Sequence, residues 1–207
     1  MNRLRSPGGC PWDAEQTHQS LVEYLIEEAY ECVEAIEAND QRGMQEELGD
    51  MLLQVVFHSR IAEPSWDIDN VIQGITTKLI DRHPHVFADE ELNTSIETAT
   101  DVEDSWHVRK AKEKGRNSLT EGIPEALPGL MQAAKLDSRT KSLGVPDSQQ
   151  AELAENIFSG ISDESELGDL FLEFARLARS RGWDAEASVR AAVRRRVEVI
   201  KQHELGN

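Results

Sequence analysis

Apolar residues recur at helical spacing in two long segments near the N-terminus, and this periodicity constrains the fold more than any other feature. The first segment predicts a helix from residue 21 to about residue 38, ended by Asn39-Asp40; its apolar positions are Leu21, Val22, Leu25, Ile26, Ala29, Val33 and Ile36. Ser20 is the expected N-cap, with Glu23 completing a capping box. The second helix is predicted over 44–62, before Pro64, and its middle is apolar nearly all round, which is typical of a helix buried on several sides.

The rest of the chain continues the helical pattern. Val, Ile and Thr do not recur in alternating runs, and Ala, Leu, Glu, Gln and Arg dominate instead. Further helices are predicted over 67–82, 94–113, 124–143 (capped by Gly144), within 148–160, and over 164–181 and 184–203. The sequence therefore predicts an all-α fold.

Charge and composition limit the classes of partner. The 207 residues carry a net charge of −17, which argues against a general affinity for nucleic acid or for anionic lipid. An enzyme this acidic that acts on phosphates would need a metal. Cys10 and Cys32 provide no disulfide framework, and no apolar stretch approaches ~18 residues. We therefore expect a soluble, cytoplasmic protein with neither nucleic acid nor membrane as a partner.

Acidic residues form two closely spaced groups on the first two predicted helices. Glu27, Glu28 and Glu31 fall within one turn of the first helix, and Glu47 and Asp50 repeat the three-residue spacing on the second. Fifteen residues separate the groups, which allows a hairpin to bring four carboxylates together. Such a group favours an oxygen-binding cation, Mg²⁺ or Mn²⁺ rather than Zn²⁺. The alternative is a solvated acidic face on an amphipathic bundle. Gly within the second helix, at position 49, calls for a packing or site reason.

Four motifs resemble those of the MazG family of nucleoside triphosphate pyrophosphohydrolases. The stretch 9–18 reads GCPWDAEQTH, 27–31 reads EEAYE and matches E-E-x-x-E, 47–50 reads ELGD and matches E-x-x-D, and 78–87 reads KLIDRHPHVF. The resemblance implies tandem four-helix-type units, with a helical bundle completed by dimerisation. It also implies Mg²⁺-dependent hydrolysis of nucleoside triphosphates to a monophosphate and pyrophosphate, a housecleaning role in nucleotide metabolism.

The same resemblance assigns roles to residues. Glu28, Glu31, Glu47 and Asp50 would be the metal ligands, with Mn²⁺ able to replace Mg²⁺, and Glu27 would activate or orient water. The alternatives are a narrower dUTP, dCTP or phosphoribosyl-ATP pyrophosphohydrolase, or a non-catalytic helical dimer that binds a nucleotide or a partner.

Substrate contacts are expected from two further places. Lys78 and Arg82, four residues apart, would reach the phosphates, although such a pair near a helix end also complements the helix dipole. Trp12 and Gln16 offer a stacking face and an amide to a base, or else a loop aromatic that closes the end of the bundle. His58 is interpreted as a core histidine with its hydrogen bonds satisfied.

An internal repeat organises the chain. The stretch 47–52, ELGDML, is echoed by 166–171, ELGDLF, and Trp66-Asp67 is echoed by Trp183-Asp184. The second copy lacks E-E-x-x-E. The expected domains are a MazG-like catalytic repeat at 1–114, a linker at 115–123 and a degenerate second repeat at 124–207.

Overall fold

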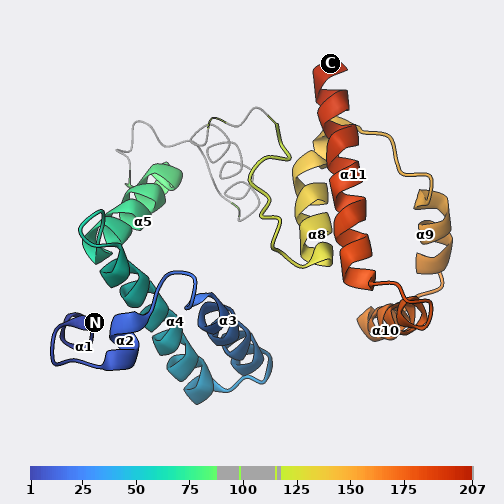
Figure 1. Ribbon diagram of the computed structural model, residues 1–207. Helices are drawn as coiled ribbons and strands as arrows, with labels where there is room; N and C mark the ends of the chain where they lie inside the picture. The colour runs from blue at the N-terminus through green and yellow to red at the C-terminus, as the bar shows by residue number, and fades with distance from the viewer. Residues whose placement is uncertain (88–97, 99–114, 116–117, 207) are drawn as a thin grey trace. The chain divides into compact units, whose positions relative to one another are not determined.

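The computed structural model describes residues 1–87, 98, 115 and 118–206, and every regular element within them is a helix (Figure 1). The predicted all-α fold class is therefore confirmed. The chain forms two compact units, Met1–Glu103 and Asp104–Asn207. The helix predicted over 94–113 falls outside the described residues. No helix of the described part of the chain is both long and apolar enough to cross a membrane.

The first unit is built on a helical hairpin of α3 (Val22–Glu37) and α4 (Gln41–Ala62), which pack against each other along their length (Figure 1). The three-residue connection makes the two helices antiparallel neighbours. Asn39 takes a left-handed φ of 55°, and the Asp40 carboxylate accepts hydrogen bonds from the backbone N–H groups of Arg42 and Gly43. Asp40 therefore starts α4 three residues before the predicted position.

The predicted capping box at the start of α3 is wrong. The helix has Leu21 as its N-cap and no side-chain cap. The Ser20 hydroxyl is used in the preceding turn instead, where it accepts from the Thr17 N–H at 2.9 Å and donates to the Gln16 side-chain oxygen at 2.6 Å. Ser20 therefore fixes the loop before the helix rather than the helix itself.

The other helices in the described part of the first unit are three short ones and one long one. They are α1 (Asn2–Arg5), α2 (Pro11–Glu15), α5 (Ile68–Arg82) and α6 (Pro84–Phe87). Asp67 caps α5 in a reciprocal capping box with Asn70, so the predicted start of this helix is confirmed within one residue.

The second unit is organised around α8 (Gly129–Thr140) and α11 (Ala185–Gly206), which lie side by side in Figure 1. Leu136, Val193 and Ile200 form its buried core. The short helix η2 (Lys141–Leu143) ends at Gly144, whose φ of 61° confirms the predicted cap. Within residues 118–206 the other helices are α9 (Ala151–Phe158) and α10 (Glu164–Ser180), close to their predicted bounds.

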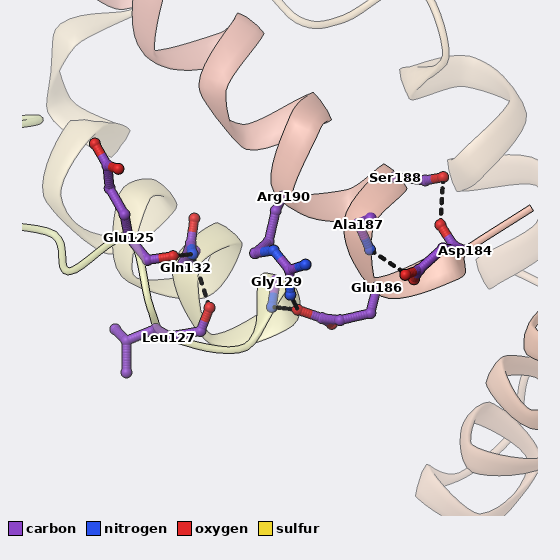
Figure 2. Close-up of polar contacts among 9 residues, drawn as sticks. All are labelled: Glu125, Leu127, Gly129, Gln132, Asp184, Glu186, Ala187, Ser188 and Arg190. Carbon is purple, nitrogen blue, oxygen red and sulfur yellow. Dashed lines mark hydrogen bonds and ion pairs between the residues drawn. The ribbon is translucent and has the colours of Figure 1, made fainter. Parts of the chain in front are cut away.

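The helix predicted from Pro124 begins instead at Gly129, with Pro128 as its N-cap. A proline disfavours helical backbone in the residue before it, so the helix cannot extend upstream through Pro128. Figure 2 shows what replaces the missing helical bonds: the Gln132 amide donates to the carbonyls of Glu125 and Leu127 at 2.8 and 2.7 Å. The Glu186 carboxylate, from α11, accepts from the Gly129 N–H at 2.7 Å (Figure 2).

Candidate metal and nucleotide site

Three carboxylates converge on the face of the α3–α4 hairpin. Glu28 from α3, with Glu47 and Asp50 from α4, each offer an oxygen atom, and these atoms lie within 4.8 Å of one another. Among the described residues this is the single group of three or more metal-ligating side chains so arranged. The spacing of three between Glu47 and Asp50 puts both on one face of α4, and the short turn at 38–40 aligns that face with Glu28.

The carboxylates of this cluster repel one another, and no positive charge among the described residues offsets the repulsion felt by Glu28 and Glu47. The pKa of Glu28 is raised, first by partial burial and then by the negative charges of Asp50, Glu31 and Glu27. The pKa of Glu47 is raised by desolvation and then by Glu31, Asp50 and Glu28. The neighbouring negative charges thus make Glu28 and Glu47 harder to ionise. A divalent cation with oxygen ligands removes this repulsion, so the residues present fit such an ion.

The other two predicted acidic residues lie at the border of the cluster. Glu31 is exposed and is close enough to raise the pKa of both Glu28 and Glu47, but it is outside the group of three. Glu27 is exposed, and its charge has the smallest effect on Glu28. Gly49 has no packing explanation within the described chain, since a Cβ there would meet no atom within 4 Å.

The loop before α3 places an aromatic ring at one end of the hairpin. Trp12, on α2, is half exposed and meets Tyr24 of α3 and Phe57 of α4 edge-on, with ring centres 5.8 and 6.5 Å apart. The Gln16 amide donates to the Trp12 carbonyl at 3.0 Å and accepts from Ser20 at 2.6 Å. Trp12 therefore both packs on the bundle and exposes a surface, and each polar atom of the Gln16 amide keeps one further hydrogen-bonding position.

The two predicted phosphate-binding cations lie on α5 and differ in exposure. Lys78 is half-buried, whereas Arg82 is only 4% exposed and already has an interaction partner. As folded here, Arg82 lies inside the first unit rather than on its surface. Phosphate contact by either side chain stays a prediction, and burial leaves Lys78 the more accessible of the two.

The sequence patterns did not predict a contact between two histidines, His18 and His58. The Nδ1 atoms of His18 and His58 are 2.8 Å apart and their rings are nearly parallel, with Trp66 stacked on His18. The expectation of a fully satisfied His58 is wrong in part, because its Nε2 is buried with no hydrogen-bond partner. Burial, followed by the charge of His18, lowers the pKa of His58. The pair joins residues forty positions apart, a contact that no local pattern reveals.

The second copy of the E-x-x-D motif is used differently. Glu166 lies at the third position of α10, where its backbone N–H bonds to Asp163 and its carboxylate accepts from the Ser162 N–H at 2.8 Å. Glu47 is instead the seventh residue of α4. The Glu166 carboxylate therefore stabilises a helix start, whereas the Glu47 carboxylate faces another helix.

Together, the fold and the cluster define an all-α protein with a group of three carboxylates on a helical hairpin that could hold a metal ion. Comparison with known sequences makes the class specific. The sequence model of the MazG nucleotide pyrophosphohydrolase domain matches residues 16–87, which include all five acidic residues. The chain belongs to the MazG family, as its relatives show.

Three relatives illustrate the similarity. The chain is 38% identical to the nucleoside triphosphate pyrophosphohydrolase/pyrophosphatase MazG of Thermotoga maritima, over 99% of this chain and 82% of that one. It is 35% identical to the nucleoside triphosphate pyrophosphohydrolase of Escherichia coli K12, over 93% and 80%. An uncharacterized 26.1 kDa protein of Streptomyces cacaoi is 47% identical, over 93% of this chain and 74% of its own length.

Proposed function

We propose that this chain hydrolyses nucleoside triphosphates to a nucleoside monophosphate and pyrophosphate. The observation that carries the proposal is the convergence of Glu28, Glu47 and Asp50 within 4.8 Å on the α3–α4 hairpin. Membership of the MazG family supports the same reaction. A protein with a net charge of −17 repels a triphosphate unless a cation intervenes, and the cluster is where one fits.

The ligands in this proposal are Glu28, Glu47 and Asp50, with Glu31 joining them, and the cation is Mg²⁺, with Mn²⁺ as a substitute. When bound, the cation supplies positive charge that polarises the phosphoanhydride and offsets the charge of the triphosphate. The four carboxylates hold that charge on two packed helices, so little reorganisation is needed during the reaction. Glu27, exposed beside Glu28, is the candidate to accept a proton from the attacking water.

The nucleoside end is assigned to the aromatic end of the hairpin. Tyr24 precedes Glu28 by one helical turn, about 6 Å along α3, and Phe57 follows Asp50 by about 10 Å along α4. Because the helices are antiparallel, both steps lead in the same direction from the cluster, to Trp12. A nucleotide whose phosphates lie at the carboxylates can therefore place its base near Trp12 and Gln16, with Lys78 contacting the distal phosphates.

Pyrophosphate release from a panel of ribo- and deoxyribonucleoside triphosphates tests the proposal. We expect turnover with Mg²⁺ or Mn²⁺, loss of turnover with EDTA, and loss in Asp50→Asn. Glu34→Gln, which removes an exposed α3 carboxylate outside the cluster, is the matched control and should retain wild-type activity. Nucleotide binding without turnover of any triphosphate would favour a non-catalytic nucleotide-binding dimer. Turnover confined to dUTP, dCTP or phosphoribosyl-ATP would favour a narrower enzyme.

We also propose that the first unit pairs with a second copy of the chain. Large apolar side chains on three of its helices are 38–61% exposed, among them Leu25, Ile26, Tyr30, Val33, Ile36, Leu48, Leu52, Leu53, Ile72, Ile75 and Leu79. Large exposed apolar surfaces of a soluble protein often mark a protein–protein interface. Sedimentation equilibrium would give the mass of a homodimer; a monomer at all concentrations would contradict this proposal.

The two repeats are proposed to have different roles. We assign catalysis to the first repeat, predicted at 1–114, and a structural role to the degenerate repeat at 124–207, separated by a linker at 115–123. The helix-capping role of Glu166 supports this assignment. The cytoplasm, where nucleoside triphosphates are abundant, is the location we propose.

A further inference from the structure

We infer that Arg5 is a positioning residue that fixes the base-recognition loop of Trp12 and Gln16 against α4. This inference rests on the proposed function, since it concerns how the nucleoside end of the substrate is held. The sequence model of the family begins at residue 16, so Arg5 and Trp12 lie upstream of the matched domain.

The guanidinium of Arg5 holds the end of α2. Its Nη1 donates to the carbonyl of Asp13 and, at 3.2 Å, to the carbonyl of Gln16, the C-cap of that helix. A cation at this position also complements the dipole of the helix C-terminus. Because α2 has only five residues, its own hydrogen bonds cannot keep it folded. The conformation of the loop therefore depends on contacts from outside, and Arg5 supplies two of them.

The same guanidinium is anchored on α4. Its central carbon lies 5.4 Å from the centre of the Phe57 ring, within the range of a cation–π interaction. Phe57 is 3% exposed, so the ring is a fixed surface. Trp12 meets this ring edge-on. One buried aromatic side chain thus locates both the clamping cation and the proposed base-stacking ring.

The N-terminal segment reverses direction between α1 and α2, which places Arg5 beside the end of α2. The Cys10 N–H donates to the Leu4 carbonyl at 2.8 Å, and the Gly9 N–H donates to the Ser6 carbonyl at 2.8 Å. A Cβ at Gly9 would overlap the carbonyl oxygens of Arg3 and Leu4, so this reversal requires glycine. The reversal brings α1 back onto α2 and delivers Arg5 to the loop.

Loss of Arg5 should therefore weaken nucleoside binding without disturbing the reacting groups. The carboxylates belong to α3 and α4, which pack mainly against each other and take neither of their N-caps from α2. The substitution Arg5→Met keeps the apolar stem of the side chain and removes the guanidinium. We expect KM for nucleoside triphosphates to rise about tenfold and kcat to change by less than about twofold. Preference among bases should also diminish.

The experiment measures kcat and KM for ATP, GTP, CTP and UTP in four full-length proteins: wild type, Arg5→Met, Trp12→Ala and the double variant. Arg3→Met, which removes an exposed arginine from the same short helix, is the matched control and should match wild type. If Arg5 acts through the Trp12 loop, its substitution should add little to KM once Trp12 is alanine. Thermal unfolding is recorded for each protein.

Three results would overturn the inference. The first is an unchanged KM in Arg5→Met, and the second is an effect of Arg5→Met on KM that is as large in the Trp12→Ala background as in the wild type. The third is a loss of kcat accompanied by a loss of thermal stability, which indicates a purely structural role. Each leaves the proposed function standing, because the wild type still turns over. Absence of turnover by the wild type with every nucleotide and cation would instead reject the proposed function itself.

Discussion

Substituting Asp50 by Asn should have opposite effects on the stability of the metal-free and metal-bound protein. In the folded chain, Asp50 shares a space 4.8 Å across with Glu28 and Glu47. The change removes one negative charge and keeps the shape of the side chain. Asn and Asp have similar helix propensities, so the intrinsic stability of α4 changes little. What remains is the difference in electrostatic interaction within the cluster.

The size of the metal-free effect follows from the geometry of one pair. The ligand oxygens of Glu28 and Asp50 lie within 4.8 Å of each other. Two unit charges at that limit repel by about 0.9 kcal/mol in bulk water, and physiological salt screens about half of this. Relief of about 0.5 kcal/mol in a domain of about 100 residues raises Tm by about 2–4 °C. The neighbouring Glu47 adds to the effect in the same direction.

Metal binding should reverse this order. If Mg²⁺ binds the wild type with a Kd of about 1 mM, then at about 10 mM it stabilises the folded state by about 1.4 kcal/mol, or about 6–11 °C in Tm. Asp50→Asn, with one ligand fewer and one charge fewer, should show a much smaller rise. The variant is therefore the more stable protein in EDTA and the less stable one in Mg²⁺.

Thermal unfolding by circular dichroism in EDTA and over a Mg²⁺ titration measures both effects. Glu34→Gln is again the control, because it makes the same change of net charge on the hairpin but outside the cluster. If Asp50→Asn and Glu34→Gln respond to Mg²⁺ equally, the ion is screening the net charge of the protein. The interpretation of the cluster as a metal site would then be refuted.

Three further predictions concern single residues. Glu47→Gln should lower kcat/KM by at least about 10- to 100-fold, because losing a residue that only supports a metal ligand already has an effect of this size. Glu46→Gln, at the neighbouring position, should leave kcat/KM unchanged. Glu186→Ala removes the acceptor for the first backbone N–H of α8, so urea unfolding of the second unit should show a loss of about 1–2 kcal/mol. Burial and then the charge of His18 lower the pKa of His58 from its ordinary 6.5, so the unfolded chain binds more protons below that pH. Stability from this group is complete above pH 6.5 and is lost as pH falls through the folded pKa; in His58→Gln, melts between about pH 7.5 and pH 5 should show a shallower acid loss.

Much of the fold followed from the sequence because its signals are local. Helical periodicity places α3, α4, α10 and α11 within a few residues of their observed bounds. The convergence of Glu28 with Glu47 and Asp50 also followed, because a short turn leaves two helices little choice but to lie antiparallel. One error occurred where a residue had two possible partners. The hydroxyl of Ser20 bonds within the preceding turn instead of capping the helix.

Two sets of contacts in the first unit that the sequence did not reveal involve the polar segment before α3. The interactions of Arg5 with Asp13, Gln16 and Phe57, and the pairing of His18 with His58, join residues 8 to 52 positions apart. Each depends on how a loop with no periodic pattern folds back on α4. Periodicity reports which face of a helix is apolar, but it carries no information about which loop covers the end of a hairpin.

In the first unit, the proposed pairing of two copies and the proposed binding of a cation should both stabilise the same hairpin. Its buried apolar side chains, among the described residues, are Leu21, Cys32, Ala35 and Phe57, a small core for a unit of about 100 residues. The hairpin that carries this core also carries the repelling carboxylates on one part of its surface and exposed apolar side chains on others. A second copy that covers the apolar surface and a cation that neutralises the cluster would each stabilise the same two helices. Since the second copy and the cation act on the same hairpin, binding of one should make binding of the other more favourable. The polar loop that Arg5 holds would then pack Trp12 against a rigid surface.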